Sequence, residues 1–174
     1  MQQVFITADR LKSLKKEPET IKLLESICKC KIEVDNEGSI TITADDGYSE
    51  FVAKNIIFAY GRGFDMRTAE LLEHEEYYFA QIDLGPLFSE KRLVQMKARL
   101  IGETGKTKKY IENVSGAKLS IYGDTISFIG SASQIEEAKT AVNVLIEGGT
   151  HKLAYAKMEA AHRKNKAARH DPKF

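Results

Sequence analysis

The stretch RLIGETGKTKKYIENVSGAKLSIYG, residues 99–123, carries two glycines in GETGKT that resemble half of a nucleotide-binding loop. The loop of a nucleotide hydrolase needs the pattern G-x-x-x-x-G-K-[ST] and follows a buried parallel strand. Leu100 stands where that pattern requires its first glycine, and residues 91–101 have the apolar spacing of a charged helix. The spacing therefore argues against a nucleotide hydrolase loop.

The elements around the glycine pair follow a definite order. Apolar residues recur at helical spacing on both sides of the pair, and a serine N-cap opens a further helix near residue 131. Between these helices, two short segments alternate apolar and polar residues around a Gly-Asp turn, which predicts a hairpin. The predicted order is strand, helix, helix, strand, strand and helix, over residues 77–84, 89–101, 106–115, 117–123, 125–130 and 131–149.

The N-terminal part of the chain repeats this order. A strand at residues 2–7 precedes two helices, a pair of strands lies within residues 30–43, and a helix closes the unit at residues 47–63. A duplicated α+β unit of about 70 residues explains both halves. The alignment that keeps apolar positions in step pairs Glu25 with Glu112, Lys31 with Lys118 and Ile40 with Ile126.

The two copies differ at the turn between their first two helices. The second copy has GETG at residues 102–105, whereas the first has KEPE at residues 16–19, with no glycine and more negative charge. We therefore expect the first copy to bind phosphate poorly and to buttress the second or offer a protein-binding face. The expected division is residues 1–76 for the first, degenerate domain, 77–150 for the second domain with the GETG loop, and 151–174 for a C-terminal helix and basic tail.

A tight G-x-x-G turn between two helices is typical of the KH module, which clamps the backbone of a few unpaired nucleotides. Glycines let that backbone approach closely, the following helix offers free N–H groups, and lysines complete the clamp. Bases would then lie across an apolar groove. The alternative is a plain helix–helix turn with no ligand. The predicted RNA-binding set is Arg99, Ile101, Gly102, Glu103, Thr104, Gly105, Lys106, Lys108, Lys109, Leu119 and Ile121.

Three stretches together resemble one family. Residues 99–130, FAYGRGF at 58–64 and IEGGTHKLAYAKMEAA at 146–161 are similar to the archaeal small-subunit assembly factors related to the eukaryotic partner-of-NOB-one protein. Within the last stretch, His151, Tyr155 and Glu159 match the family's spacing. The resemblance covers nearly the whole chain and is weakest over residues 1–35.

The resemblance implies a fold and a function. The expected fold is α+β, with two tandem type I KH domains, each a three-stranded antiparallel sheet backed by three helices, plus a C-terminal helix. The implied ligand is single-stranded ribosomal RNA near the 3′ end of the small-subunit RNA. The implied role is small-subunit assembly and 3′-end maturation, with the processing endonuclease and the alpha subunit of translation initiation factor two as partners. The residues carried over as the clamp are Gly102, Glu103, Thr104, Gly105 and Lys106.

Several residues have two interpretations. Arg62, Gly63, Phe64 and Lys118 are candidates for secondary RNA contacts, although the first three also fit a helix end with a packing aromatic. His151 and Tyr155 lie one helical turn apart and either stack on a base or dock the final helix. The tail HRKNKAARHDPKF, residues 162–174, is either a phosphate-binding arm or a solvated end.

Composition also bears on the class of protein and on its location in the cell. The net charge is only +1, but residues 1–76 carry 10 Lys/Arg against 15 Asp/Glu, while residues 151–174 carry 7 against 2. Cys28 and Cys30 have no ligand-spaced partners, so no metal or other cofactor is expected. No apolar run approaches a membrane span and no signal segment is evident, which favours the cytoplasm. We expect no enzyme. The rival hypothesis is a protein-interaction scaffold in which RNA contact is incidental.

Overall fold

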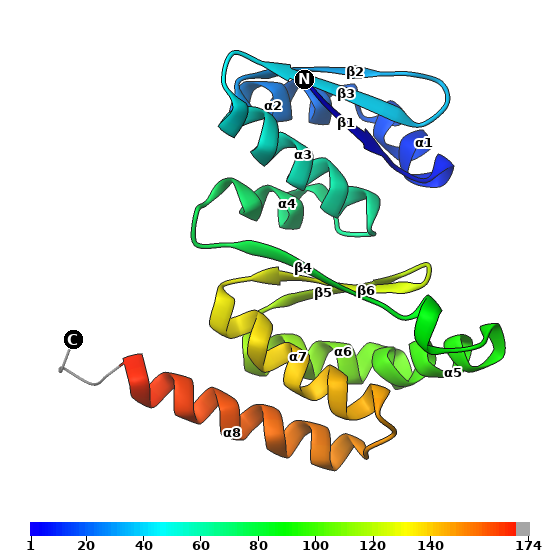
Figure 1. Cartoon of the computed structure of the whole chain (residues 1–174), viewed down its shortest axis with the longest axis vertical. Helices are drawn as coiled ribbons and strands as arrows, with labels where there is room; N and C mark the ends of the chain where they lie inside the picture. The colour runs from blue at the N-terminus through cyan, green and yellow to red at the C-terminus, as the bar shows by residue number, and fades with distance from the viewer. Residues whose placement is uncertain (170–174) are drawn as a thin grey trace. The chain divides into compact units, whose positions relative to one another are not determined.

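The computed structural model describes residues 1–169, and the chain divides into two compact units, Met1–Phe79 and Ala80–Phe174. Each unit is built from one three-stranded antiparallel sheet and helices (Figure 1). This arrangement confirms the predicted α+β class and its two sheets. No helix among residues 1–169 has both the length and the apolar character needed to cross a bilayer.

The first unit follows the predicted order of elements through α3 and then adds two short helices, α4 and η1, that were not predicted. Strand β3 lies at the centre of its sheet, between β1 and β2, and runs antiparallel to both. The elements are β1 (Gln2–Phe5), α1 (Ala8–Lys16), α2 (Pro18–Cys28), β2 (Cys30–Val34), β3 (Ser39–Ala44), α3 (Gly47–Gly61), α4 (Met66–Ala69) and the 3-10 helix η1 (Glu70–Glu73).

Alternation along β3 places its isoleucines in the core of the first unit. Ile40 and Ile42 are both fully buried, and the helix α3 contributes Ile56 and Ile57 to the same core. Cys28 ends α2 and Lys29 adopts a left-handed conformation with φ 51°, so that Cys30 begins the next strand. The two cysteines therefore belong to different elements.

The second unit repeats the order and the strand arrangement. Its sheet has the order β4-β6-β5, which corresponds to β1-β3-β2 in the first unit. The elements are β4 (Tyr78–Asp83), the 3-10 helix η2 (Gly85–Leu87), α5 (Glu90–Ile101), the 3-10 turn η3 (Glu103–Gly105), α6 (Lys106–Ser115), β5 (Lys118–Tyr122), β6 (Thr125–Gly130), α7 (Ala132–Ile146) and α8 (His151–Arg169).

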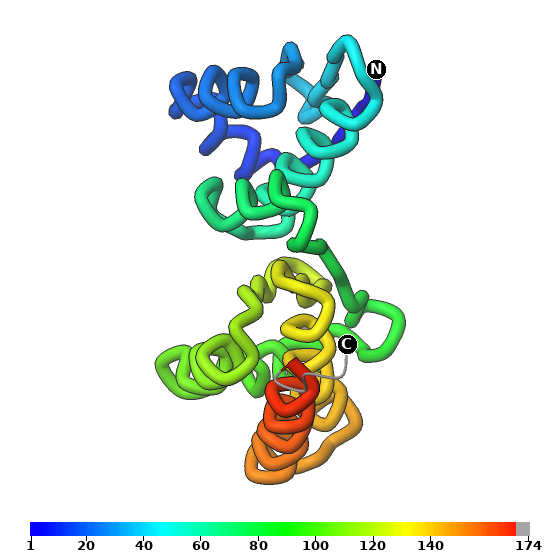
Figure 2. Tube along the Cα trace, turned by 90° about the vertical axis from the view of Figure 1, so that its left-hand side faces the viewer, coloured from blue at the N-terminus to red at the C-terminus, as the bar shows by residue number. Residues whose placement is uncertain are grey.

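The core of the second unit lies between its sheet and the layer of α5, α6 and α7. Ile126 and Phe128 on β6 are fully buried and pack with Leu100 and Ile111 from the helices. Burying a side chain the size of Phe128 contributes on the order of 2–3 kcal/mol. Helix α8 forms a further layer on the helical side, where it lies along α7 and also contacts α6 (Figure 2).

One side-chain hydrogen bond recurs at matched positions of the two units. Glu25 near the end of α2 accepts a hydrogen bond from the backbone N–H of Ile32, with 2.8 Å between the atoms. Glu112 near the end of α6 accepts the equivalent bond from Leu119, also at 2.8 Å. Each carboxylate ties a helix to the strand that follows it. The two residues that the sequence alignment pairs, Glu25 and Glu112, therefore make the same hydrogen bond in their own units.

Candidate nucleic-acid interface

The GETG segment forms a tight turn between α5 and α6. The backbone N–H of Gly102 closes α5 on the carbonyl of Ala98 at 2.9 Å, and that of Gly105 returns to Gly102 at 3.2 Å. Three of the four residues have positive φ angles, with 76° at Gly102, 52° at Thr104 and 78° at Gly105. Positive φ is costly for residues other than glycine, so this backbone explains why glycines stand at both ends of the turn.

The two glycines are required for different reasons. A Cβ atom on Gly102 would lie 2.7 Å from the backbone nitrogen of Thr107, so a side chain does not fit there. A Cβ atom on Gly105 would meet nothing within 4 Å. The open space beside Gly105 is what a close-approaching ligand backbone requires. Gly102 is thus packed against the start of α6, whereas the Cα of Gly105 faces open space.

The corresponding junction of the first unit has another geometry. Helix α1 ends at Lys16, Glu17 has φ −121°, and Pro18 occupies the first turn of α2. Residues 16–19 are all described and none of them has a positive φ. The acidic junction therefore lacks both the glycine conformation and the charge that the second unit provides.

The predicted RNA-binding cations differ in exposure and in their contacts with other residues. Lys106 is the first residue of α6, and both Lys106 and Lys109 are exposed. Lys108 is half-buried, with its Nζ atom 3.6 Å from the Glu112 carboxylate. Arg99 donates a hydrogen bond to the carbonyl of Gly149, in the segment before α8. Lys106 and Lys109 are thus the cations of the turn that make no such contact with the described residues.

The predicted apolar groove is only partly present. Ile101 is 36% exposed and Ile121 is half-buried, so both have surface to offer. Leu119 is only 3% exposed and packs in the core of the second unit. This placement corrects the expectation that Leu119 lines the groove, because its strand turns that side chain toward the helical layer. Lys118, at the start of β5, is exposed.

Two open depressions flank the GETG turn. One, of about 450 Å³, is lined by Gly102, Glu103 and Lys106 together with His151 and Tyr155 of α8. The other, of about 330 Å³, is lined by Thr104, Lys106, Lys109, Tyr110 and Asn113. Sequence reasoning missed Tyr110 and Asn113. The available signal was their spacing, since positions 106, 109, 110 and 113 fall on one face of a helix.

Helix α8 is tied to the turn by polar and aromatic contacts. Tyr155 donates a hydrogen bond from its hydroxyl to Thr107 Oγ1 at 3.3 Å, and its ring lies 4.2 Å from that of Tyr110. His151 Nε2 lies 3.1 Å from the carbonyl oxygen of Arg99. Tyr110 in turn donates its hydroxyl to Glu159, which raises the pKa of Tyr110. The docking interpretation of His151 and Tyr155 is confirmed.

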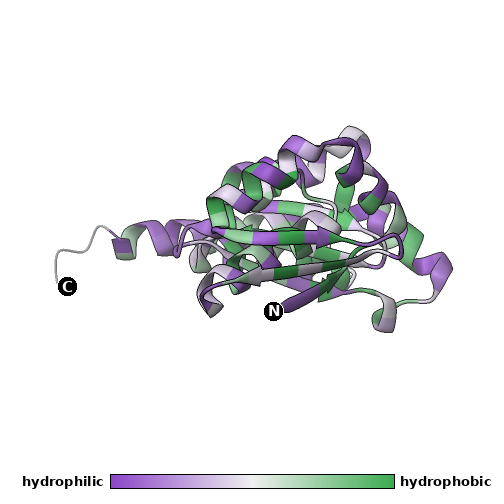
Figure 3. Cartoon of the chain, turned by 90° about the horizontal axis from the view of Figure 1, so that it is seen from above, coloured by the Kyte–Doolittle hydropathy of each residue, from purple (hydrophilic) through white to green (hydrophobic). Residues whose placement is uncertain are grey.

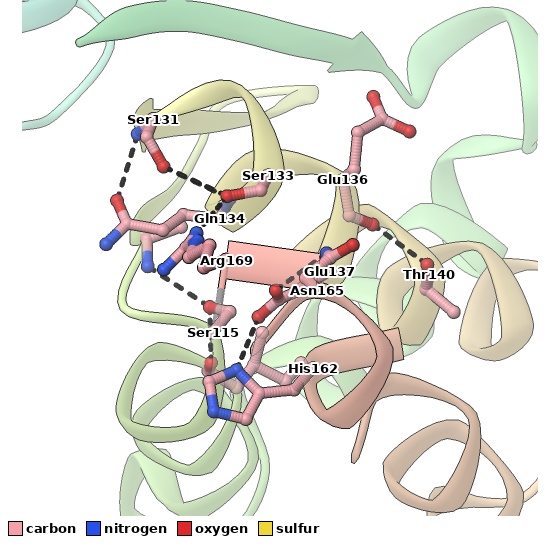
Figure 4. A network of polar contacts seen from close by, with 12 residues as sticks. Ser115, Ser131, Ser133, Gln134, Glu136, Glu137, Thr140, His162, Asn165 and Arg169 are labelled. Carbon is pink, nitrogen blue, oxygen red and sulfur yellow. Dashed lines mark hydrogen bonds and ion pairs between the residues drawn. The ribbon is translucent and has the colours of Figure 1, made fainter. Parts of the chain in front are cut away.

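The far half of α8 is held by a buried carboxylate on α7 (Figure 4). Glu137 is 2% exposed and accepts hydrogen bonds from His162 Nδ1 and Asn165 Nδ2, each at 2.8 Å. Arg169 also bonds to Ser133 near the start of α7. The segment expected to be a tail is therefore helical through Arg169, while its last five positions, 170–174, lie outside the described residues.

The remaining candidates belong to the first unit. Phe64 is 4% exposed, and its carbonyl accepts a hydrogen bond from Arg10. Arg62 caps α3, and its guanidinium lies 5.5 Å from the ring centroid of Phe58. Gly63 follows with φ 96°. The buried Phe64 side chain corrects the expectation of an RNA contact there, because this segment serves to end the helix.

The turn and fold of the second unit define a KH domain. Residues 78–163 match the family model for the second KH domain of PNO1, described as a eukaryotic type KH domain (KH-domain type I). A KH domain-containing protein of Methanocaldococcus jannaschii is 34% identical over 153 residues, which cover 85% of this chain and 67% of that protein. The chain belongs to the PNO1/Dim2p family of KH-domain proteins, and the resemblance seen in the sequence is confirmed.

Other relatives agree with this assignment. The RNA-binding protein pno1 of Dictyostelium discoideum is 30% identical over 109 residues, and the match spans 61% of this chain but only 46% of that protein. The crystal structure of Dim2p from Pyrococcus horikoshii has a TM-score of 0.83 at 36% identity, covering 91% of this chain and 98% of that one. A structure of the a/eIF2alpha–aDim2p–rRNA complex from the same organism has a TM-score of 0.87 at 35% identity, covering 94% of each chain.

Proposed function

We propose that the second unit binds unpaired ribosomal RNA and that the GETG turn holds the RNA backbone. The observation that carries this proposal is the turn itself, in which Gly105 has open space at its Cα and Lys106 follows it directly as the first residue of α6. The solved complex of aDim2p with rRNA supports ribosomal RNA as the class of ligand.

The clamp acts through charge and backbone donors. No side chain caps the N-terminus of α6, so the positive end of the helix dipole is open to an anion. Lys106 and Lys109 lie on the same face and would neutralise adjacent phosphates. Glu103 and Thr104 form the tip of the turn, where their backbone, more than their side chains, sets its shape. Arg99 and Lys108 make contacts within the protein, with Gly149 and Glu112, and we propose that they hold the clamp in place.

Bases of the bound strand would lie beside the turn on apolar and aromatic surface. Ile101, which is exposed, and the half-buried Ile121 provide the apolar surface of the expected groove. Lys118, exposed at the start of β5, is proposed as a secondary contact. Tyr110 adds an aromatic ring to the depression that contains Lys106 and Lys109, and aromatic rings stack on unpaired bases.

The first unit is proposed to be a degenerate KH domain, over residues 1–76, with the working KH domain over residues 77–150. Its support is the repeated element order, the repeated strand order and the matched bonds at Glu25 and Glu112. The KEPE junction lacks the features that make the GETG turn a phosphate site. We therefore assign RNA binding to the second unit alone.

In this proposal the protein is a cytoplasmic, non-enzymatic assembly factor of the small ribosomal subunit. Its RNA site would lie near the 3′ end of the small-subunit RNA, where it would act alongside the processing endonuclease. The complex of aDim2p with a/eIF2alpha supports the alpha subunit of translation initiation factor two as a partner. The 3′ position and the endonuclease rest on the family resemblance alone.

A Gly105→Asp variant tests the clamp. The substitution places a negative carboxylate where the phosphate would pass, in a position with room for it. We expect the variant to lose most of its affinity for short unpaired strands from the 3′ end of small-subunit rRNA, measured by fluorescence anisotropy. Its melting temperature should fall only slightly, because a side chain at φ 78° costs on the order of 1 kcal/mol. Scrambled strands serve as the ligand control. Equal binding by the variant and the wild-type protein would contradict the proposal.

A scaffold function is the second candidate, and exposed aromatic residues in the first unit favour it. Phe5 is 70% exposed, Tyr48 58% and Phe51 57%. Exposed aromatics of this kind often mark protein-binding surfaces. The two candidates differ in salt dependence, because an RNA clamp releases counterions and loses affinity steeply as salt rises. Weak, sequence-independent RNA binding together with tight binding of the alpha subunit would favour the scaffold.

A further inference from the structure

Helix α8 uses one face entirely for docking. Ala154 and Met158 are fully buried against the rest of the second unit. Its polar and aromatic contacts come from the same side of the helix, since they recur at steps of three and four residues. The residues of this docked face are His151, Ala154, Tyr155, Met158, His162 and Asn165.

The opposite face of α8 is exposed, and every charged residue on it is basic. Lys152, Lys157, Arg163 and Lys164 are exposed, and none of them makes a hydrogen bond or ion pair with another described residue. Between them lie exposed alanines, and the end of the helix toward Arg169 is drawn mostly in hydrophilic colours in Figure 3. The one acidic residue of α8, Glu159, accepts the Tyr110 hydroxyl. We call these four cations and their alanines, Ala156, Ala160 and Ala167, the outer α8 face.

Helix α8 begins beside the GETG turn. His151 and Tyr155, in the first turns of α8, line the same depression as Gly102 and Lys106. Lys152 is the neighbour of His151 and is exposed. RNA that leaves the clamp on this side would therefore meet a helix about 28 Å long, from the rise of 1.5 Å per residue.

We propose that the outer α8 face is a second RNA-binding surface, which holds the phosphate backbone of double-stranded RNA flanking the unpaired segment. This inference rests on the proposed function of the GETG turn. Proteins that hold unpaired strands offer aromatic rings for stacking, yet every aromatic side chain of α8 belongs to the docked face. A face of cations and alanines suits a duplex, whose bases are paired and whose surface is phosphate and ribose.

The same composition argues against a protein partner. Protein interfaces are anchored by aromatic and large apolar side chains. On the exposed side of α8 only Leu153, at 45% exposure, is of that kind. The four cations of the outer α8 face, on a helix with no exposed carboxylate, complement a polyanion instead.

The test compares two charge-matched variants. The outer-face variant carries Lys152→Gln, Lys157→Gln, Arg163→Gln and Lys164→Gln. The control variant removes four exposed lysines from α1 and α2 of the first unit, by Lys12→Gln, Lys15→Gln, Lys16→Gln and Lys22→Gln. Each is titrated with a short unpaired rRNA strand and with the same strand joined to a hairpin stem, over a range of salt concentrations.

We expect the outer-face variant to bind the stem-containing RNA about tenfold or more weakly than the wild-type protein. Its slope of log affinity against log salt should fall by about 3.6, because each of the four lost phosphate contacts removes about 0.9. Its affinity for the unpaired strand alone should be nearly unchanged, which also shows that it is folded. The control variant should behave as the wild-type protein on both RNAs.

Three outcomes would overturn the inference. The first is unchanged binding of the stem-containing RNA by the outer-face variant. The second is an equal loss on both RNAs, which would make the face part of the clamp. The third is displacement of the stem-containing RNA by polyglutamate as efficiently as by a competing duplex, which would indicate a surface for acidic protein. The Gly105→Asp variant separates the two proposals. If it binds the unpaired strand as tightly as the wild-type protein does, the clamp proposal is contradicted, whereas the result for the outer α8 face is unaffected.

Discussion

Gly102 and Thr107 approach each other so closely that a Cβ atom on Gly102 would lie 2.7 Å from the Thr107 backbone nitrogen. Gly102 also has φ 76°. Because a substitution meets both a clash with backbone and an unfavourable conformation, Gly102→Ala should lower the free energy of unfolding by about 2 kcal/mol or more. Urea denaturation followed by circular dichroism measures this change.

The matched control is Gly105→Ala. Gly105 has a similar φ of 78° but no neighbour within 4 Å of its Cβ position. Only the conformational cost remains there, on the order of 1 kcal/mol. If Gly105→Ala lowered the free energy of unfolding as much as Gly102→Ala or more, the distinction between a packed Gly102 and a solvent-facing Gly105 would be contradicted.

Lysines around the turn should differ in their contribution to RNA affinity. Lys106 and Lys109 are exposed, whereas Lys108 lies 3.6 Å from the Glu112 carboxylate. Lys106→Gln and Lys109→Gln should each lower the slope of log affinity against log salt by about 0.7 for an unpaired strand. Lys108→Gln should have a smaller effect. Anisotropy titrations at several salt concentrations decide this, and a larger effect at Lys108 than at Lys106 would refute the assignment.

Local signals in the sequence are sufficient to predict the turn and the order of the longer elements, but not the short helices α4, η1 and η2. Glycines at 102 and 105, alternation along residues 117–130 and the serine at 131 each act within a few residues of chain. Ser131 indeed forms a capping box with Gln134. The alignment of Glu25 with Glu112 was also readable, because both copies keep the same apolar spacing around these carboxylates.

Tertiary packing explains what the sequence did not predict. Alternation shows that Leu119 and Ile121 share a face, but not that the helices cover Leu119 and leave part of Ile121 open. The contact between Tyr155 and Thr107 joins residues 48 positions apart. No local pattern encodes such a pair, so the part played by α8 beside the turn emerged only from the structure.

The buried carboxylate of Glu137 should make the docking of α8 sensitive to its two donors. The double variant His162→Ala with Asn165→Ala leaves that carboxylate without these hydrogen bonds. Leaving a buried charge unpaired should cost about 2–4 kcal/mol of unfolding free energy. Adding Glu137→Gln should recover part of the loss, because a neutral amide is cheaper to bury. Urea denaturation of the wild-type protein, the double variant and the triple variant tests this. An unchanged free energy of unfolding in the double variant would contradict it.

The two cysteines should react slowly in the folded protein. Burial raises the pKa of the Cys28 thiol to about 12, and burial also raises the pKa of Cys30. Since the thiolate is the reactive form, Cys28 at pH 8 should have on the order of 1000-fold less of it than an unfolded thiol. Iodoacetamide labelling followed by mass spectrometry should modify Cys28 only after unfolding in urea. Rapid labelling of Cys28 under native conditions would show the assignment to be wrong.

Tyr110 should give the docking of α8 a dependence on alkaline pH. The hydrogen bond to Glu159 raises the pKa of Tyr110 in the folded protein above its unfolded value. The bond therefore stabilises the fold fully below the unfolded pKa, near 10, and this stabilisation is lost as the pH rises through the higher folded pKa. The difference in urea midpoint between wild-type protein and Tyr110→Phe should be constant below about pH 9 and shrink above it. Because the other titrating groups are common to both proteins, a difference that instead grows with pH would contradict the role of this hydroxyl.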